Sequence, residues 1–145
     1  MLVPIGGGGL ISGMINVFKQ KSPKTRIIGI EPKGAPSMYE SMRQNKRITL
    51  DRIDNFVDGA AVKTIGKISF DYCSKFLDDI VIVDEGEICQ NILTMYNNDA
   101  IIVEPAGAMS ITGLNKMSKS IKDKNVVCLI CGGNNDITLS LIHIS

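Results

Sequence analysis

The chain of 145 residues has no tryptophan, a single histidine and only 5% aromatic residues. So few aromatic side chains argue against a platform on which the bases of single-stranded nucleic acid stack. Its 16 basic and 15 acidic side chains leave a formal net charge of +1. Affinity for DNA or RNA depends on a surplus of cations against the phosphates. We therefore expect no nucleic-acid partner.

Long apolar runs are absent as well, since none approaches the roughly 20 residues that a membrane-spanning helix requires. The first residues also lack a charged segment followed by a cleavable apolar stretch, the pattern of an export signal. These two absences predict a cytoplasmic protein without a membrane partner.

Cysteine occurs at only four positions, 73, 89, 128 and 131. Cys128 and Cys131 form one C-x-x-C pair, which is compatible with a redox pair or with half of a zinc site. The second pair and the histidines that zinc would need are missing. Because the pair ends an apolar run, we favour reduced thiols in or just past a buried strand, and we predict no metal site.

The sequence does contain short apolar blocks rich in β-branched residues, at positions 2–5, 27–30, 80–83, 101–103 and 126–130. Unbroken apolar runs of this length are typical of strands covered on both faces. Between them, apolar residues recur at helical spacing in the segments 10–18, 68–76, 88–96 and 108–114. The alternation predicts an α/β fold with a mostly parallel sheet flanked by helices.

Both ends of the chain look unusual for a complete domain. A predicted strand begins almost at once, with nothing ahead of it to pair with or cover it, so we expect residues 1–138 to be a domain incomplete at its N-terminus. Residues 139–145 stop without a turn or cap and read like a translated sequencing-library adapter. We interpret this segment as a suspected non-native tail, with a short final strand as the alternative, and assign no chemistry to its His143.

The strongest local motif is a run of four glycines between a predicted strand and a predicted helix. We call residues 6–10, namely Gly6, Gly7, Gly8, Gly9 and Leu10, the glycine loop. Glycines let a ligand approach the backbone N–H groups closely, and the following helix N-terminus adds free donors and a partial positive charge. The loop therefore predicts an anion site, with phosphate as the usual occupant.

Two alternatives to a phosphate site remain for the glycine loop. It lacks the Lys-Ser/Thr ending of a P-loop, but Glu31 lies about 20 residues on, where a dinucleotide-binding protein has its ribose-binding acid. A merely flexible turn is the other alternative.

Three more segments place small or polar residues where strands end. Cys131 follows the apolar run 126–130 and precedes two glycines, and Glu104 follows the run 101–103 and precedes Pro105. In open α/β folds, ligands bind outside the carboxyl ends of the strands. Cys131 and Glu104 are thus candidate ligand contacts, although a packed thiol and a solvated helix cap are the simpler interpretations. The small-residue loop 56–62 could also approach a ligand closely.

Six motifs, in this order, carry a resemblance to a known family: VPIGGGGLISG, GIEPKGAPSM, FVDGAAVK, LDDIVIV, VEPAGA and CLICGGNND. The chain resembles the fold-type II pyridoxal-phosphate enzymes from about residue 2 to about residue 138. Within them it looks most like the biosynthetic threonine ammonia-lyases, also called threonine dehydratases. The resemblance implies part of the large domain of such an enzyme, with pyridoxal 5'-phosphate as cofactor.

The resemblance also assigns roles to particular residues. Gly6, Gly7, Gly8, Gly9 and Leu10 would hold the cofactor phosphate through backbone N–H groups. Cys131 stands where the family usually has Ser, facing the pyridine nitrogen, and Glu104 matches a supporting glutamate beside the cofactor.

A cation site is known from the serine-racemase branch of the family. It would map to Glu31, Ala35 and Ser37. Because Ser37 replaces the acid expected there, we predict no bound metal.

One family element has no counterpart in this sequence. The Schiff-base lysine of the family lies in a Ser-Phe-Lys-x-Arg-Gly segment ahead of the glycine loop, and no such segment occurs among the 145 residues. The one Phe-Lys pair, Phe18-Lys19, falls on the predicted helix after the loop, where a solvated lysine is expected. We therefore name no catalytic residue and expect the chain alone to be inactive.

For the intact protein, the resemblance implies conversion of L-threonine to 2-oxobutanoate and ammonia, the first committed step toward isoleucine. L-Serine, giving pyruvate, is the expected second substrate because one methyl group discriminates weakly. We expect the intact protein to be a homo-oligomer. The alternatives are a catabolic threonine dehydratase, a serine racemase or a non-catalytic phosphate-binding module. A further alternative is that the isolated chain does not fold.

Overall fold

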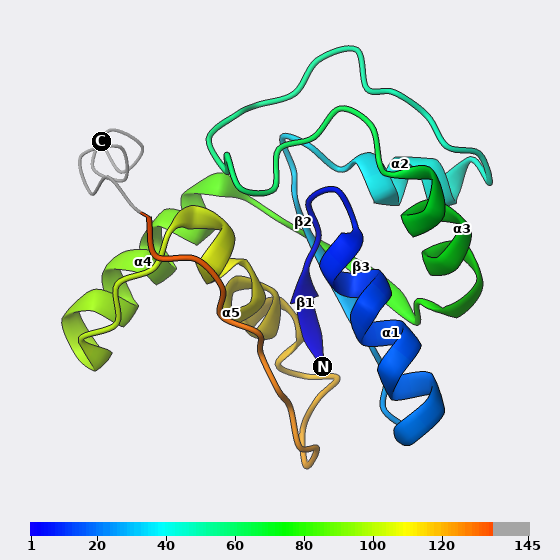
Figure 1. The fold of residues 1–145 in the computed structure, drawn as a ribbon. Helices are drawn as coiled ribbons and strands as arrows, with labels where there is room; N and C mark the ends of the chain where they lie inside the picture. Colours follow the sequence, from blue (N-terminus) through cyan, green and yellow to red (C-terminus); the bar gives the residue numbers. More distant parts are fainter. Residues whose placement is uncertain (135–145) are drawn as a thin grey trace.

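The computed structural model describes residues 1–134 and contains a three-stranded parallel sheet (Figure 1). Its strands are β1 (Leu2–Pro4), β2 (Ile28–Pro32) and β3 (Asp79–Val83), in the order β1-β2-β3. Leu2 pairs with Ile28, which pairs in turn with Asp79. The predicted parallel sheet is confirmed. The suspected tail 139–145 and His143 lie outside the described residues.

The predicted strand at 126–130 is present only as an extended segment beside β1. The N–H of Leu2 donates to the carbonyl of Val127 at 2.8 Å, and the N–H of Leu129 donates to the carbonyl of Leu2 at 3.0 Å. These bonds make a single parallel bridge between Leu2 and Cys128. The pairing direction agrees with the prediction, but β1 is too short to support a longer ladder.

The strand predicted at 101–103 is wrong. The preceding helix is longer than expected, and Ala100 ends it in a left-handed conformation with φ of 56°. The N–H of Ile101 still donates to the carbonyl of Met95 in that helix. One residue past the segment, the N–H of Glu104 donates to the carbonyl of Gly132 at 3.2 Å. Because the N–H of Ile101 remains bonded to α4, it is not available to a neighbouring strand.

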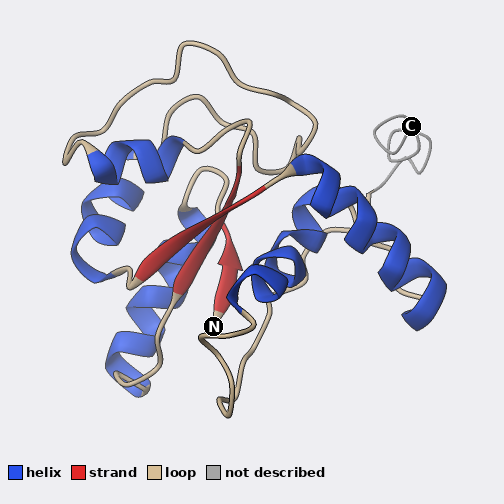
Figure 2. Ribbon diagram, turned by 180° about the vertical axis from the view of Figure 1, so that it is seen from behind, coloured by secondary structure: helices blue, strands red, loops and turns tan. Residues whose placement is uncertain are grey.

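In the described part of the chain, five helices surround the sheet, and the four predicted ones are confirmed. They are α1 (Gly9–Lys21), α2 (Ser37–Arg43), α3 (Lys67–Phe76), α4 (Glu85–Asp99) and α5 (Pro105–Met117). α1, α2 and α3 cover one side of the sheet, while α4 and α5 cover the other (Figures 1 and 2). No helix in residues 1–134 is both long and apolar enough to cross a membrane.

Two apolar cores fill the space between sheet and helices, as alternation along β1 requires. Leu2 joins the core beneath α4 and α5, together with Ile88 and Met109. The next residue, Val3, joins the core beneath α1 and α3, together with Ile15. Both faces of the sheet are therefore covered, which explains why its strands are mostly apolar.

The helix α2 was not predicted from the apolar pattern because its start is held by a buried acid. The two carboxylate oxygens of Glu31 accept the N–H groups of Met38 at 2.8 Å and Tyr39 at 2.7 Å. Glu31 is fully buried at the end of β2. Its carboxylate satisfies two of the donors that a helix start leaves free.

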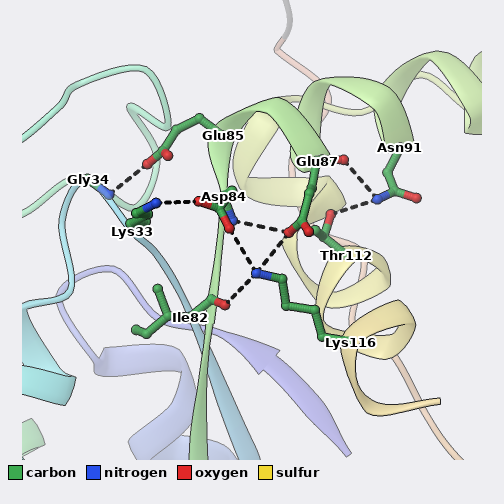
Figure 3. A network of polar contacts seen from close by, with 9 residues as sticks. All are labelled: Lys33, Gly34, Ile82, Asp84, Glu85, Glu87, Asn91, Thr112 and Lys116. Carbon is green, nitrogen blue, oxygen red and sulfur yellow. Dashed lines mark hydrogen bonds and ion pairs between the residues drawn. The ribbon is translucent and has the colours of Figure 1, made fainter. Parts of the chain in front are cut away.

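A polar network joins the end of β3 to the first turn of α4 (Figure 3). The carboxylate of Asp84 pairs with Lys33 at 2.8 Å and with Lys116 at 3.0 Å. Lys116 also pairs with Glu87 at 2.9 Å and donates to the carbonyl of Ile82 at 3.2 Å. Lys33 and Lys116 come from segments outside α4, so the network ties α4 to β2 and α5.

Candidate functional site

A cavity of about 260 Å³ opens where β1 ends. The structure brings all seven candidate residues together there, although they come from three distant parts of the sequence. The remaining lining residues are small or apolar. Among the described residues, the lining is Pro4, Gly6, Gly7, Gly8, Gly9, Leu10, Gly59, Ala60, Glu104, Ala106, Cys131 and Gly132.

The glycine loop presents its backbone donors to this cavity. Within the described residues, none of the N–H groups of the loop donates to another protein group. The first intrahelical bond of α1 runs from the N–H of Ser12 to the carbonyl of Gly8 at 3.1 Å. The loop and the first turn of α1 thus leave several N–H groups free beside the positive end of a helix dipole.

The four glycines differ in the space around them. Gly8 has φ of 87°, and a Cβ there would lie 2.6 Å from the Cβ of Ser69 in α3. At Gly7 and Gly9, by contrast, a Cβ would meet no atom within 4 Å. Gly8 therefore sets the turn, while the exposed Gly7 and Gly9 leave open space along the cavity.

The loop at 56–62 forms another wall. A Cβ on Gly6 would lie 3.0 Å from the carbonyl oxygen of Gly59 and 3.2 Å from the Cα of Ala60. This close backbone approach explains the glycine at position 6, while Gly59 is kept small by Glu104 and Ala106. From the sequence, the loop at 56–62 is a possible ligand contact but not an assigned part of the site. Its small side chains are the one sequence feature that indicates a close approach.

Glu104 is the only carboxylate among the cavity-lining residues within 1–134. It precedes α5, and its Oε2 accepts the N–H of Asn134 at 3.3 Å. A Cβ on Gly59 would lie 2.8 Å from Oε1, and one on Gly132 would lie 2.2 Å from it. Gly132 also has φ of 89°. Two glycines therefore make room for this side chain.

Cys131 contributes a neutral thiol to the same cavity. Burial raises the pKa of this thiol above its ordinary value, and the negative charge of Glu104 raises it further. All four cysteines are free. The half-buried Cys128 lies on the segment that pairs with β1, so the packed-thiol interpretation holds for it.

Glu31 does not lie at this cavity, which removes the dinucleotide alternative. Its carboxylate is fully buried and accepts two backbone N–H groups of α2, so a ribose cannot reach it. Ala35 is also fully buried, as is Ser37. Within residues 1–134, no three His, Cys, Asp or Glu side chains gather as metal ligands would.

The donor set fits a phosphorylated, ring-bearing cofactor. Free N–H groups at a helix start suit a phosphate, and a Cβ at Gly7 or Gly9 would occupy space that is now open. Across the cavity, a neutral thiol and a carboxylate supply polar contacts for the rest of such a molecule. Fold and site together define an α/β cofactor-binding protein of the phosphate-cradling class.

Comparison with known proteins identifies the particular family. The family model described as pyridoxal-phosphate dependent enzyme matches residues 1–132. The chain belongs to this family, whose members depend on pyridoxal phosphate.

Among curated proteins, the chain is similar to biosynthetic threonine dehydratases. It is 59% identical over 133 residues to the L-threonine dehydratase biosynthetic IlvA of Halalkalibacterium halodurans, covering 92% of this chain and 32% of that protein. It is 54% identical over 134 residues to the protein of the same name from Staphylococcus epidermidis, with the same coverage. The chain thus spans about a third of the length of these relatives.

Solved structures confirm the expected fold type. The processed form of threonine deaminase isoform 2 from Solanum lycopersicum matches with a TM-score of 0.92 and 37% identity, over 98% of this chain and 42% of that one. Maize serine racemase matches with a TM-score of 0.86 and 30% identity, over 94% and 44%. Both are neighbours in fold, so the fold alone does not separate these two activities.

Proposed function

We propose that this chain is the cofactor-holding part of a threonine ammonia-lyase that converts L-threonine to 2-oxobutanoate and ammonia. The observation that carries the proposal is the 59% identity to a protein named as a biosynthetic threonine dehydratase. The gathering of all seven candidate residues at one cavity supports it. In the proposal, residues 1–138 belong to the catalytic domain and 139–145 are non-native.

In this proposal the glycine loop binds the phosphate of pyridoxal 5'-phosphate through its free N–H groups. Cys131 would contact the pyridine nitrogen, and the neighbouring Glu104 would support the ring. When bound, the cofactor supplies an electron sink for the bond-breaking steps at an amino acid. A neutral thiol does not hold the pyridine nitrogen protonated as a carboxylate does. This milder sink suits elimination of the β-hydroxyl.

We further propose L-serine as the second substrate, a cytoplasmic location and a role in isoleucine synthesis. A pocket that accepts threonine discriminates weakly against serine, since one methyl group separates the two. The proposed intact protein is a homo-oligomer.

The test is to read the coding sequence on both sides of this chain and to assay the complete polypeptide. We expect an upstream Ser-Phe-Lys-x-Arg-Gly segment. We also expect the complete polypeptide to release 2-oxobutanoate from L-threonine, measured by the absorbance of the hydrazone that 2-oxobutanoate forms. The 145-residue chain with added cofactor should release none above a protein-free control. A complete polypeptide without such a lysine and without activity would leave a phosphate-binding module instead.

Serine racemase is the second candidate, because the maize enzyme shares the fold with a TM-score of 0.86. Chiral analysis of the products from L-serine separates the two activities. A threonine ammonia-lyase yields pyruvate, whereas accumulation of D-serine as the main product would favour the racemase.

A further inference from the structure

Ser12 lies one turn into α1, behind the glycine loop rather than in the cavity lining. Its Oγ donates to the carbonyl of Gly8 at 2.6 Å, and the same carbonyl accepts the N–H of Ser12 at 3.1 Å. The Oγ also contacts the Sγ of Cys73 in α3 at 3.8 Å. Burial raises the pKa of Cys73 to about 11, so this thiol stays neutral and can bond to the hydroxyl.

These contacts matter because a peptide unit is planar and trans. Its C=O and its N–H point in opposite directions. Holding the carbonyl of Gly8 toward Ser12 therefore turns the N–H of Gly9 away from the helix, toward the cavity. In the same way, the N–H of Gly66 donates to the carbonyl of Gly7 at 3.3 Å and directs the N–H of Gly8.

A helix start alone does not need the Ser12 hydroxyl. The N–H of Ser12 already makes the first helical bond, and a mid-helix serine that bonds back to the carbonyl four residues earlier is neutral or slightly unfavourable for the helix. The bond thus has no evident benefit to α1 itself. Its effect falls on the peptide between Gly8 and Gly9, which carries one of the free donors.

We propose that Ser12 is a positioning residue for the anion site, whose hydroxyl holds the Gly8–Gly9 peptide so that the Gly9 N–H faces the bound phosphate. The inference rests on the proposed function, because it takes the ligand to be the phosphate of the cofactor. It assigns Ser12 no contact with the ligand.

The experiment measures binding to the intact apoprotein by calorimetry, with pyridoxamine 5'-phosphate and inorganic phosphate as probes. Neither probe carries an aldehyde, so lysines cannot trap it. Ser12→Ala should lower the affinity for both probes by about three- to tenfold, which corresponds to the loss of roughly one hydrogen bond. Ser12→Thr, whose hydroxyl can make the same bond in a helix, should restore affinity.

A matched control removes the same kind of bond elsewhere. Thr94 donates its Oγ1 to the carbonyl of Gln90, four residues earlier in α4, at 2.9 Å. Thr94→Ala should leave both affinities unchanged. The ³¹P chemical shift of bound pyridoxamine 5'-phosphate should differ from wild type in Ser12→Ala. It should match wild type in Ser12→Thr and Thr94→Ala.

The outcomes separate the two levels of the proposal. If the wild-type protein binds neither probe, the proposed cofactor site is wrong. If it binds both and Ser12→Ala matches it in affinity and ³¹P shift, the positioning role is wrong. A lower melting temperature in Ser12→Ala with unchanged affinity would also overturn the role, since it would make the hydroxyl merely structural.

Discussion

Four consecutive glycines serve different purposes in the glycine loop. Gly8 has the positive φ that forms the turn, and Gly6 lies against the backbone of the loop at 56–62. A Cβ on Gly7 or Gly9 would meet no protein atom within 4 Å, so these two glycines leave room beside the cavity. The sequence predicts the anion site from the run as a whole. It does not distinguish these positions, because each depends on what packs behind the loop.

Alanine substitutions test this division. Gly8→Ala should lower the free energy of unfolding by about 1–3 kcal/mol, because it forces a Cβ onto a left-handed residue and against Ser69. Gly9→Ala should leave the free energy of unfolding within about 0.5 kcal/mol of wild type. It should weaken the binding of pyridoxamine 5'-phosphate. Urea unfolding and calorimetry measure the two effects. Equal stability loss in both variants would contradict the assignment.

Glu31 predicts a pH dependence of stability. Burial raises its pKa from 4.5 to about 7, although the N–H groups of Met38 and Tyr39 lower it in part. The folded protein therefore binds a proton more tightly than the unfolded chain. The resulting stability is complete below pH 4.5 and is lost as the pH rises through 7, by up to about 3 kcal/mol.

The comparison variant is Glu31→Gln, which cannot titrate. The difference in unfolding free energy between wild type and Glu31→Gln should fall steadily from pH 4.5 to pH 8. A constant difference across this range would show that Glu31 titrates normally.

At the scale of elements, the prediction succeeded where apolar periodicity sets the structure and failed where single polar contacts do. The helices α1, α3, α4 and α5 each present an apolar face and were predicted. The short helix α2 depends on the carboxylate of Glu31, which lies outside it. The strand at 101–103 was predicted from composition alone, but the N–H of Ile101 stays bonded to α4.

The start of α4 offers a test at this scale. Hydrogen bonds from Lys33 and Lys116 hold the pKa of Asp84 below its ordinary value. Ionised Asp84 thus stabilises the fold above about pH 4, and this contribution disappears as the pH falls. Asp84→Asn should lower the melting temperature more at pH 7 than at pH 3. Asp51→Asn, which removes an exposed carboxylate outside this network, should change neither. An equal loss at both pH values would contradict the charge-based account.

At the scale of the whole molecule, one edge of the sheet is apolar and exposed. Val127 and Ile130 flank the bridging Cys128 and are 53% and 42% exposed. Open apolar edges of this kind favour association between chains. The isolated 145-residue chain should therefore elute in gel filtration as a species larger than its 15.7 kDa.

Charged substitutions at this edge test the cause. The double variant Val127→Lys with Ile130→Lys should shift elution toward the monomer. Ile68→Lys is the control, since Ile68 is 81% exposed but lies on α3, away from this edge. If only Ile68→Lys shifted elution toward the monomer, the chains would associate through a surface other than this edge.

The candidate site could be predicted from the sequence because its residues all follow strands or predicted strands. The carboxyl ends of parallel strands meet at one edge, so the glycine loop, Glu104 and Cys131 were expected to lie together. The sequence did not reveal Ser12 or Gly66, which act from behind through backbone carbonyls. Such contacts leave no compositional signal.

The most direct test of the central claim is the structure of the intact protein with pyridoxal 5'-phosphate bound. Our account predicts phosphate oxygens within hydrogen-bonding distance of the backbone nitrogens of the glycine loop, with the pyridine nitrogen facing Cys131. A second cavity of about 420 Å³, bordered by Lys24, Arg26 and Lys124, lies away from the glycine loop. A cofactor phosphate held there by these cations, with the glycine loop empty, would contradict the account.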